Sequence, residues 1–300
     1  MKQQASHNAQ MEIPIAAPSV LDTFSEYLRL ISEDRKSLLG LGIISAFVLI
    51  GIFAPYIAPY DPKQTSTLVN TPPSWQHLLG TTYLGEDVLS QVMWGSRISL
   101  IIGTAAATSA TMIGTVIGLI AGFSARRAVD ASCMRFTDIF LIIPALPLMI
   151  IFAAFFGPTM YNIIFVIGIT SWPSIARVIR SQVLGIKERT FVKAARVTGV
   201  SDVKIMFSII LPNVAPMILA NGILAITTAI VAEAGLDFLG LGAPDIVSWG
   251  TMLYWAQSFG FFYGAWWWLL APGFCIALLG FGFVLFGFAL EKIANPRLRR

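Results

Sequence analysis

The residues best suited to a specific task lie in one short basic segment, Lys193–Pro212, set between two long apolar stretches. These residue types are suited to ending helices and to packing closely against a partner. They do not form the nucleophile–base pattern of an active site. Hydroxyls at Thr190 and Ser201 can cap helix starts. Gly199 can take the left-handed conformation that ends a helix, and Pro212 interrupts one. The pattern predicts two short helices joined at a glycine corner, which together form a rigid knob on which a partner protein can dock.

No pattern in the chain predicts catalysis or cofactor binding. The sequence has no Gly-x4-Gly-Lys-Ser/Thr phosphate loop and no nucleophile–base motif, so we expect neither ATP binding by that loop nor an enzyme. The few residues of metal or redox type are far apart in sequence and fit no ligand spacing, which predicts structural roles for Cys133, Cys275, His7 and His77.

The composition predicts a membrane protein. Hydrophobic residues form 56% of the chain, charged residues 12%, and the mean hydropathy is +0.75. This surface is too apolar for a water-soluble domain. Six stretches approach the roughly 20 apolar residues that a transmembrane helix needs. We expect six spans in an all-α fold, at residues 38–58, 99–121, 139–156, 163–183, 217–231 and 266–290.

Charge placement predicts the orientation. Of the 20 Lys and Arg residues, only Lys63 and Arg97 lie in loops on one side, and the others flank the opposite ends of the spans. The positive-inside rule then places both termini and the basic segment in the cytoplasm. The net charge of +4 reflects this orientation, so no nucleic-acid partner is expected. No charged residue lies near the middle of a predicted span, which indicates that the driving force comes from outside this chain.

The ends and the span interiors carry further patterns. Apolar residues on one face between Val20 and Ile31 predict a helix lying in the inner interface, with a cytoplasmic extension of the first span as the alternative. Glycines four residues apart in the second span predict close helix packing. Prolines in the third, fourth and sixth spans mark bends. Polar and aromatic residues within the spans are candidates to line a pathway: Thr170, Ser171, Trp172, Asn221, Thr227 and Thr228.

The basic segment carries a resemblance to a known family. Ala194, Ala195, Gly199, Ile209, Leu211 and Pro212 fit the spacing EAA-x3-G-x9-I-x-L-P, which marks the membrane-spanning subunits of ABC importers. The blocks at residues 77–100, 232–242, 248–253 and 295–299 are similar to those of dipeptide-, oligopeptide- and nickel-type permeases. The resemblance implies a type I importer fold of the MetI kind. It divides the chain into an inner N-terminal segment 1–37, a first span and outer loop 38–98, a five-helix core 99–291 with a coupling loop 189–212, and a tail 292–300.

The resemblance also implies partners. A homologous permease would complete the pathway, two cytoplasmic ATPases would bring ATP and Mg, and an extracytoplasmic solute-binding protein would deliver the cargo. Peptides are the leading cargo, with oligosaccharides and nickel as alternatives. The ATPase-coupling residues that it implies are Lys193, Ala194, Ala195, Gly199, Ser201, Asp202, Ile209, Leu211 and Pro212.

Two positions depart from the family pattern. Lys193 stands where the family usually has Glu, which would complete a capping box with Thr190. Glu86 stands where the family often has Arg. Two rivals from other classes remain open, an ATP-independent carrier or channel and a purely structural membrane anchor. The coupling loop and the absence of charge within the spans argue against the carrier.

Overall fold

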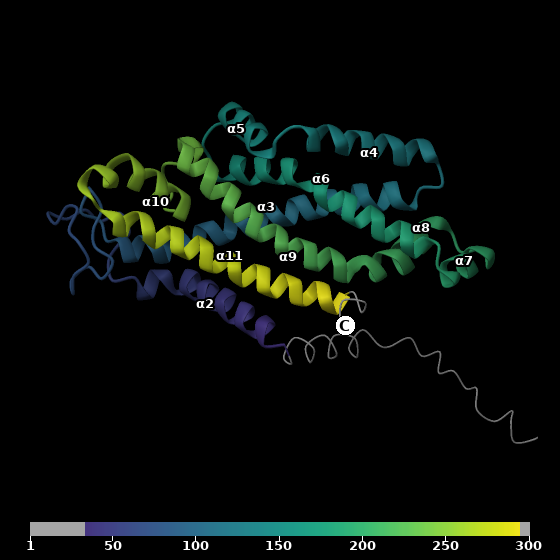
Figure 1. Cartoon of the computed structure of the whole chain (residues 1–300), viewed down its shortest axis with the longest axis horizontal. Coiled ribbons are helices and arrows are strands. Elements are labelled where there is room, and N and C mark those ends of the chain that lie inside the picture. Colours follow the sequence, from purple (N-terminus) through teal and green to yellow (C-terminus); the bar gives the residue numbers. More distant parts are fainter. Residues whose placement is uncertain (1–33, 295–300) are drawn as a thin grey trace, which may run out of the picture.

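A computed structural model describes residues 34–294, so the interfacial helix expected near the N-terminus lies outside the described residues, as do residues 295–300 of the predicted tail. Within this range the chain folds into helices that run along one long axis (Figure 1). The short helices α7 (Thr190–Val197) and α8 (Asp202–Ile205) lie at one end. Helix α10 (Trp249–Trp255) and the loop that precedes α3 lie at the other.

Long apolar helices dominate the described residues, and five of them can each cross a membrane. Four are separate rods, namely α2 (Arg35–Ile57), α3 (Val88–Phe123), α6 (Met160–Lys187) and α11 (Trp266–Ala294). The fifth is a helical run, Asp202–Leu241. A sixth crossing exists if the bent pair α4 (Arg127–Ile142) and α5 (Ala145–Phe156) counts as one span. The all-α fold predicted from composition is confirmed.

The third span differs from the prediction because it is not one rod over residues 139–156. Helices α4 and α5 meet at an angle of 86°. Ile143 and Pro144 both have extended backbone at the break, with ψ of 127° and 128°. Proline has no N–H to donate to the helix and disfavours helical geometry in the residue before it. Pro144 therefore marks the break, whereas α6 and α11 continue through Pro173 and Pro272.

The fifth span is also longer than predicted, in both directions. It begins with α8, continues through the π-helical segment η1 (Met206–Ile210) and α9 (Leu211–Leu236), and ends in the π-helical η2 (Asp237–Leu241). The helix therefore carries Glu233 and Asp237, which lie beyond the predicted end of the span at residue 231. Hydropathy could not find this outer end, because the carboxylates lower the apolar signal while the helix persists.

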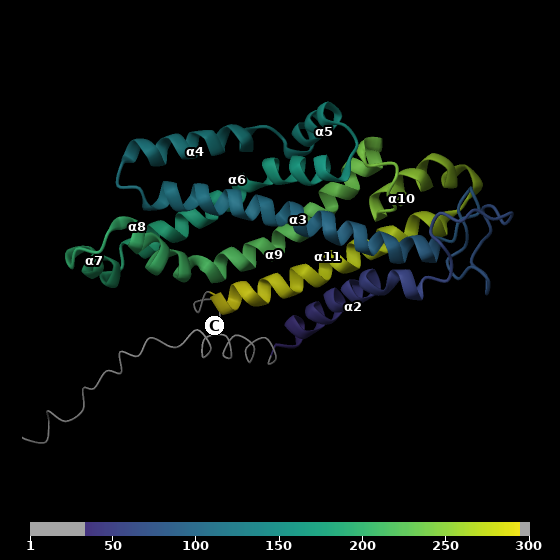
Figure 2. The ribbon, with the colours of Figure 1, turned by 180° about the vertical axis from the view of Figure 1, so that it is seen from behind.

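Small residues hold α3 against α6, as the glycine pattern predicted. Figure 2 shows α3 running the length of the molecule beside α6. A Cβ added to Gly118 would lie 2.8 Å from the carbonyl oxygen of Ala176, and one added to Gly122 would lie 2.7 Å from Cβ of Val183. Any larger side chain on these turns would force the two helices apart.

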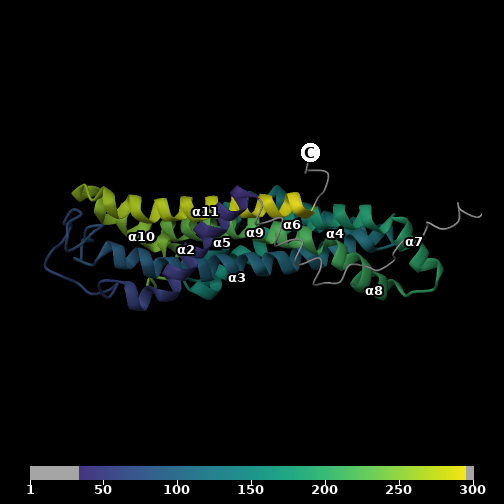
Figure 3. The same cartoon turned by 90° about the horizontal axis from the view of Figure 1, so that it is seen from below.

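The remaining rods complete a flat bundle, as Figure 3 shows from below. Helix α9 packs against both α3 and α11, and α2 packs against α11 and α3. Close approach again relies on glycine, because a Cβ on Gly40 of α2 would lie 2.7 Å from the carbonyl oxygen of Gly282 in α11. At the far end a short hairpin contains α10, the π-helical η3 (Ala256–Gly260) and the 3₁₀ turn η4 (Phe261–Tyr263).

Candidate functional site

A glycine corner between α7 and α8 confirms the predicted knob. Gly199 has a φ of +82°, in the left-handed region that disfavours residues with a Cβ. Its N–H donates to the carbonyl of Arg196 at 3.1 Å, and the N–H of Val200 donates to the carbonyl of Ala195 at 3.1 Å. These two bonds form the Schellman pattern that ends a helix at glycine. A side chain at Gly199 would meet no atom within 4 Å, so only its backbone conformation requires glycine.

The second knob helix begins as predicted, since the Ser201 hydroxyl accepts the N–H of Lys204 at 3.4 Å. An ion pair between Arg196 and Asp202, at 3.2 Å, ties it to α7. The expected interruption at Pro212 is wrong. The helix passes through η1 instead, and Pro212 lies in α9 directly after this π-helical segment.

The start of α7 also differs from the prediction. Arg189 holds the N-cap position without a side-chain bond, and Thr190 is the first helical residue. A glutamate at position 193 could therefore not form the capping box that the sequence suggested. Lys193 instead forms an exposed ion pair with Glu188, with Nζ 3.0 Å from Oε2. The hydrogen bond from Lys193 lowers the pKa of the Glu188 carboxyl below its usual value.

One side of the knob is exposed, and the other side is buried against the helix bundle. Val192 is 1% exposed and packs in a core cluster with Ile205 and Val183 of α6. On the outside, Ala194 and Gly199 are exposed, and so are the larger apolar side chains Phe191, Val197, Val203 and Phe207. Ile209 and Leu211 are partly buried against the core, and Pro212 is exposed. The exposed apolar and basic side chains make this end suitable for docking a protein.

The six pathway candidates are dispersed. Thr170 is buried and donates its hydroxyl to its own helix, and Trp172 is 2% exposed and stacks on Phe136 of α4. Asn221 donates to the carbonyl of Met217. Ser171 and Thr227 are partly exposed, and Thr228 is exposed. A pathway role for these residues stays a prediction.

Sequence reasoning missed a threonine stripe on α3. Thr108, Thr111 and Thr115 line an apolar groove of about 690 Å³ between α3 and α9. The buried Thr115 hydroxyl has no hydrogen-bond partner within residues 34–294. Spacings of three and four residues were the available signal, since they place all three hydroxyls on one helical face. The groove is a further candidate for contact with cargo or with another subunit.

Two carboxyl groups at the far end of the fifth span were missed as well. Glu233 and Asp237 are 0% and 1% exposed. The Ser99 hydroxyl of α3 donates to Glu233 Oε2 at 3.3 Å, and the Ser248 hydroxyl donates to Asp237 Oδ2 at 2.7 Å. Neither carboxyl forms an ion pair within the part of the chain that the structure describes. The pair links α9 to α3 and to the start of α10.

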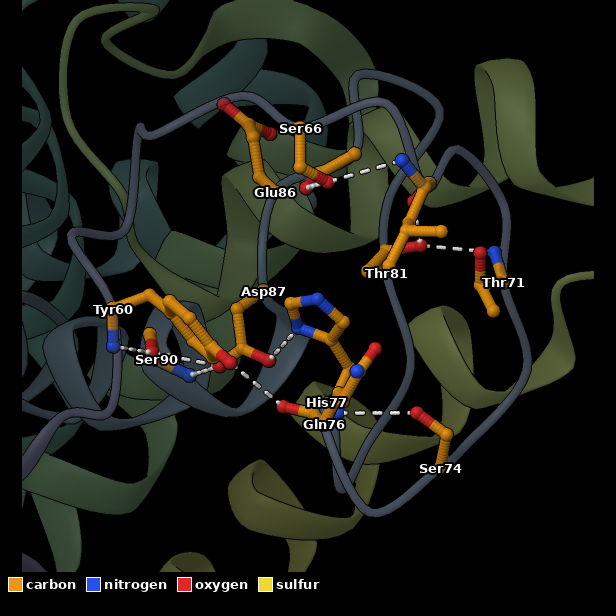
Figure 4. A network of polar contacts seen from close by, with 12 residues as sticks. Tyr60, Ser66, Thr71, Ser74, Gln76, His77, Thr81, Glu86, Asp87 and Ser90 are labelled. Carbon is orange, nitrogen blue, oxygen red and sulfur yellow. Dashed lines mark hydrogen bonds and ion pairs between the residues drawn. The ribbon is translucent and has the colours of Figure 1, made fainter.

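The loop before α3 is folded rather than open. His77 is not isolated, as its sequence position suggested. Its Nδ1 lies 2.9 Å from Asp87 Oδ1, and the Tyr60 ring covers it at a centroid distance of 4.9 Å. Asp87 also accepts the N–H and the hydroxyl of Ser90 and so caps α3. Figure 4 shows this network, with Glu86 projecting away from Asp87 and His77. A structural role for His77 agrees with this arrangement.

Comparison with known proteins identifies the architecture. Residues 114–300 match the family model described as the binding-protein-dependent transport system inner membrane component. The chain belongs to this family. Residues 25–73 of the permease also match the model of the N-terminal transmembrane domain of oligopeptide transport permease C.

Curated relatives span nearly the whole permease. It is 35% identical to the di/tripeptide transport system permease protein DppC of Pseudomonas aeruginosa (strain UCBPP-PA14), over 97% of this chain and 99% of the relative. It is 36% identical to the oligopeptide transport system permease protein OppC of Bacillus subtilis (strain 168), over 89% and 88% of the two chains. Both carry the word permease in their names, as the coupling loop led us to expect.

A solved structure supports the fold. The MetNI methionine ABC transporter, in an inward-facing conformation, contains a chain that matches with a TM-score of 0.57 and 18% identity. The match covers 70% of this permease and 97% of that chain. At this identity the likeness concerns the fold alone. It confirms the MetI-like transmembrane domain, and this chain is a multi-pass inner-membrane protein of that class.

Proposed function

We propose that this permease is one membrane-spanning subunit of an ABC importer for di- or oligopeptides. The knob formed by α7 and α8 carries the proposal, because a helix ending at a left-handed glycine sets a fixed angle between two exposed surfaces. The peptide cargo is supported by the relatives, which are named for dipeptide and oligopeptide transport. Oligosaccharides and nickel remain alternatives for the same machinery.

The proposed assembly has four kinds of partner. A homologous permease lies beside this one and encloses the pathway, and two ATPases bind ATP and Mg and dock on the knobs. A solute-binding protein docks at the opposite end. The basic residues around the knob favour a cytoplasmic location for α7 and α8 and for both termini.

In the proposed mechanism the two ends of the bundle are coupled. ATP binding closes the ATPase pair and brings the two knobs together. The bundles then tilt to open the pathway outward and receive cargo, and hydrolysis resets them. Because the fifth span begins with α8, motion of the knob acts directly on a helix that crosses the bundle.

The test is uptake into vesicles that contain the complete transporter. We expect labelled di- or oligopeptides to enter only with ATP inside and the binding protein outside. A panel with an oligosaccharide and Ni²⁺ decides the cargo class. The permease reconstituted alone should neither hydrolyse ATP nor take up peptide. Uptake by the permease alone along a proton gradient would replace this proposal with a secondary carrier, and stimulated ATPase activity without any uptake would favour the structural anchor.

A further inference from the structure

A cavity of about 260 Å³ lies at the end of the molecule opposite the knob. Its walls come from the loop before α3, from the first turn of α3, and from α10 with the segment that leads into it, and they include Lys63, Tyr83, Glu86, Gln91, Asp245 and Trp255. Known pockets for whole small molecules range from about 300 to 1,000 Å³. The cavity is therefore sized for a single long side chain rather than for a whole peptide.

Glu86 supplies a fixed carboxyl group with one free oxygen. Its Oε2 accepts a hydrogen bond from the Thr82 hydroxyl at 3.1 Å and one from Gln91 Nε2 at 2.9 Å. Its Oε1 accepts none within residues 34–294. Burial raises the pKa of the Glu86 carboxyl, while these hydrogen bonds and the charge of Lys63 act in the opposite direction. A second cation in the cavity would offset the cost of ionising this carboxyl.

Aromatic rings form a rigid wall beside the carboxyl. Tyr83 stacks on Phe259 with a centroid distance of 4.3 Å and on Trp268 with one of 5.8 Å. Trp255 stacks on the same Phe259 at 5.8 Å. Tyr83, Trp255 and Trp268 all line the cavity. Aromatic rings attract ammonium and guanidinium groups, so a cation that enters the cavity meets aromatic surface as well as a negative charge.

The charge balance of the lining also favours a cation. Glu86 and Asp245 provide two carboxyl groups, and Lys63 provides the single ammonium group. That ammonium is already engaged, because Lys63 Nζ donates to the carbonyl oxygen of Asp245 at 2.6 Å. The lining therefore carries an excess of one negative charge when its carboxyl groups are ionised.

We propose that this cavity is a socket for one Lys or Arg side chain of the solute-binding protein. The proposal rests on the proposed function, in which that protein docks at this end. Basic side chains seated in a pocket are common anchors of protein interfaces, where a few residues carry most of the affinity. The chemistry of the socket thus defines a specificity requirement, which is a basic residue on the docking face of the partner.

The experiment measures docking in the complete transporter in nanodiscs. The peptide-loaded binding protein is titrated, and its half-saturation concentration for stimulated ATP hydrolysis is recorded at low and at high salt. We expect Glu86→Gln to raise this concentration about tenfold at low salt, as for the loss of one anchor contact. Salt should weaken docking of the wild type more than docking of the variant.

A matched control is available in the same loop. Asp61 is an exposed carboxylate outside the cavity, and its Oδ1 accepts the N–H of Lys63, a contact that asparagine can keep. Asp61→Asn should leave the half-saturation concentration unchanged. Trp255→Leu removes one aromatic face without changing charge and should give a smaller increase than Glu86→Gln. It also serves as the second test if Glu86→Gln does not assemble.

Charge exchange identifies the partner residue. Substituting each exposed Lys and Arg on the binding protein by Glu, in combination with Glu86→Lys, should restore docking for one pair. Unchanged half-saturation in both Glu86→Gln and Trp255→Leu would overturn the socket. If wild-type ATP hydrolysis and uptake do not depend on any binding protein, the proposed function fails instead, so the two failures can be told apart.

Discussion

At the scale of single residues, the carboxyl groups of Glu233 and Asp237 are the most constrained feature. Both are buried one turn apart and form no ion pair within residues 34–294. Like charges placed close together in a dry region cannot both be ionised at reasonable cost. Asp237 is further enclosed by Gly242 and Gly250, where an added Cβ would lie 2.4 and 2.6 Å from its side chain. We expect the pair to act as a neutral or singly charged hydrogen-bonding unit that ties α10 to α9.

The pair can be tested with an isosteric amide. Glu233→Gln keeps an acceptor for the Ser99 hydroxyl and removes only the ionisable group, so the thermal unfolding midpoint should stay close to that of the wild type. Glu233→Ala leaves buried partners unsatisfied and should cost about 1–3 kcal/mol. Fluorescence-detected unfolding in detergent provides the measurement. Equal midpoints for the Ala and Gln variants would contradict the bonding role.

A second residue-scale prediction concerns pH. Because burial raises the pKa of the Glu86 carboxyl, this group takes up a proton at higher pH than an exposed glutamate does. Acidification should therefore neutralise the socket, and the half-saturation concentration of the binding protein should rise as pH falls. The response of Glu86→Gln should be weaker. Lys63, Asp245 and Tyr83 line the same cavity, and Asp245→Asn is the control that removes its other carboxyl group. Identical pH profiles for Glu86→Gln and the wild type would argue against Glu86 as the titrating group.

At the scale of elements, local sequence signals succeeded where one residue type dictates the backbone. Gly199, Ser201 and the α3 glycines behave as predicted, because a left-handed corner, a cap and a close helix contact each have a strong residue preference. The extent of the fifth span, the continuation of its helix through Pro212 and the position of Thr190 inside α7 were not predictable. These three features depend on packing between segments that are distant in sequence, and helix propensity and hydropathy carry no information about such packing.

The glycine corner predicts a selective loss of ATPase docking. Gly199→Val forces a β-branched residue into the left-handed region, at a local cost of about 1–2 kcal/mol, and should redirect the knob. We expect less ATPase to co-purify and transport to fall. Gly264→Val is the matched control, since Gly264 also has a positive φ and open space around it but lies near α10. Normal ATPase recovery with Gly199→Val would show that the knob is not the docking element.

The contact between α3 and α6 predicts that replacing a glycine by alanine affects stability differently in the two helices. Gly118→Ala places a methyl group against the backbone of α6 and should destabilise the bundle by about 1–3 kcal/mol. Gly185→Ala in α6 meets no atom within 4 Å, so it should be neutral or slightly stabilising. Thermal unfolding of the two variants under one condition gives the comparison. A lower midpoint for Gly185→Ala than for Gly118→Ala would contradict the packing described here.

At the scale of the whole molecule, the two ends differ in chemistry. The knob end is basic and apolar, and the opposite end combines a folded loop, a short hairpin and an acidic cavity. Composition alone indicated a membrane protein and charge alone predicted its orientation. The cavity and the carboxyl pair could not be predicted, because each joins residues more than 100 positions apart in the chain, as Ser99 and Glu233 illustrate.

Orientation is tested by cysteine labelling in whole cells after the two native cysteines are replaced. Asp245→Cys and Lys193→Cys both place the thiol at an exposed position, at opposite ends of the bundle. A membrane-impermeant maleimide should label the first in intact cells and the second only after the cells are opened. Outside labelling at position 193 would reverse the proposed topology and with it the docking of the ATPases.

The helical run from Asp202 as far as Leu239 has a mechanical consequence, and it ends where Gly240 turns the backbone with a φ of +80°. At about 1.5 Å per residue this run is a rod of roughly 55 Å, with the knob at one end and the carboxyl pair near the other. A hydrogen-bonded rod transmits force with little loss, whereas the broken α4–α5 pair can flex at its corner. A displacement imposed at α8 should therefore reach the far end of this helix almost undiminished. The fifth span would then act as a lever that couples the two ends of the permease.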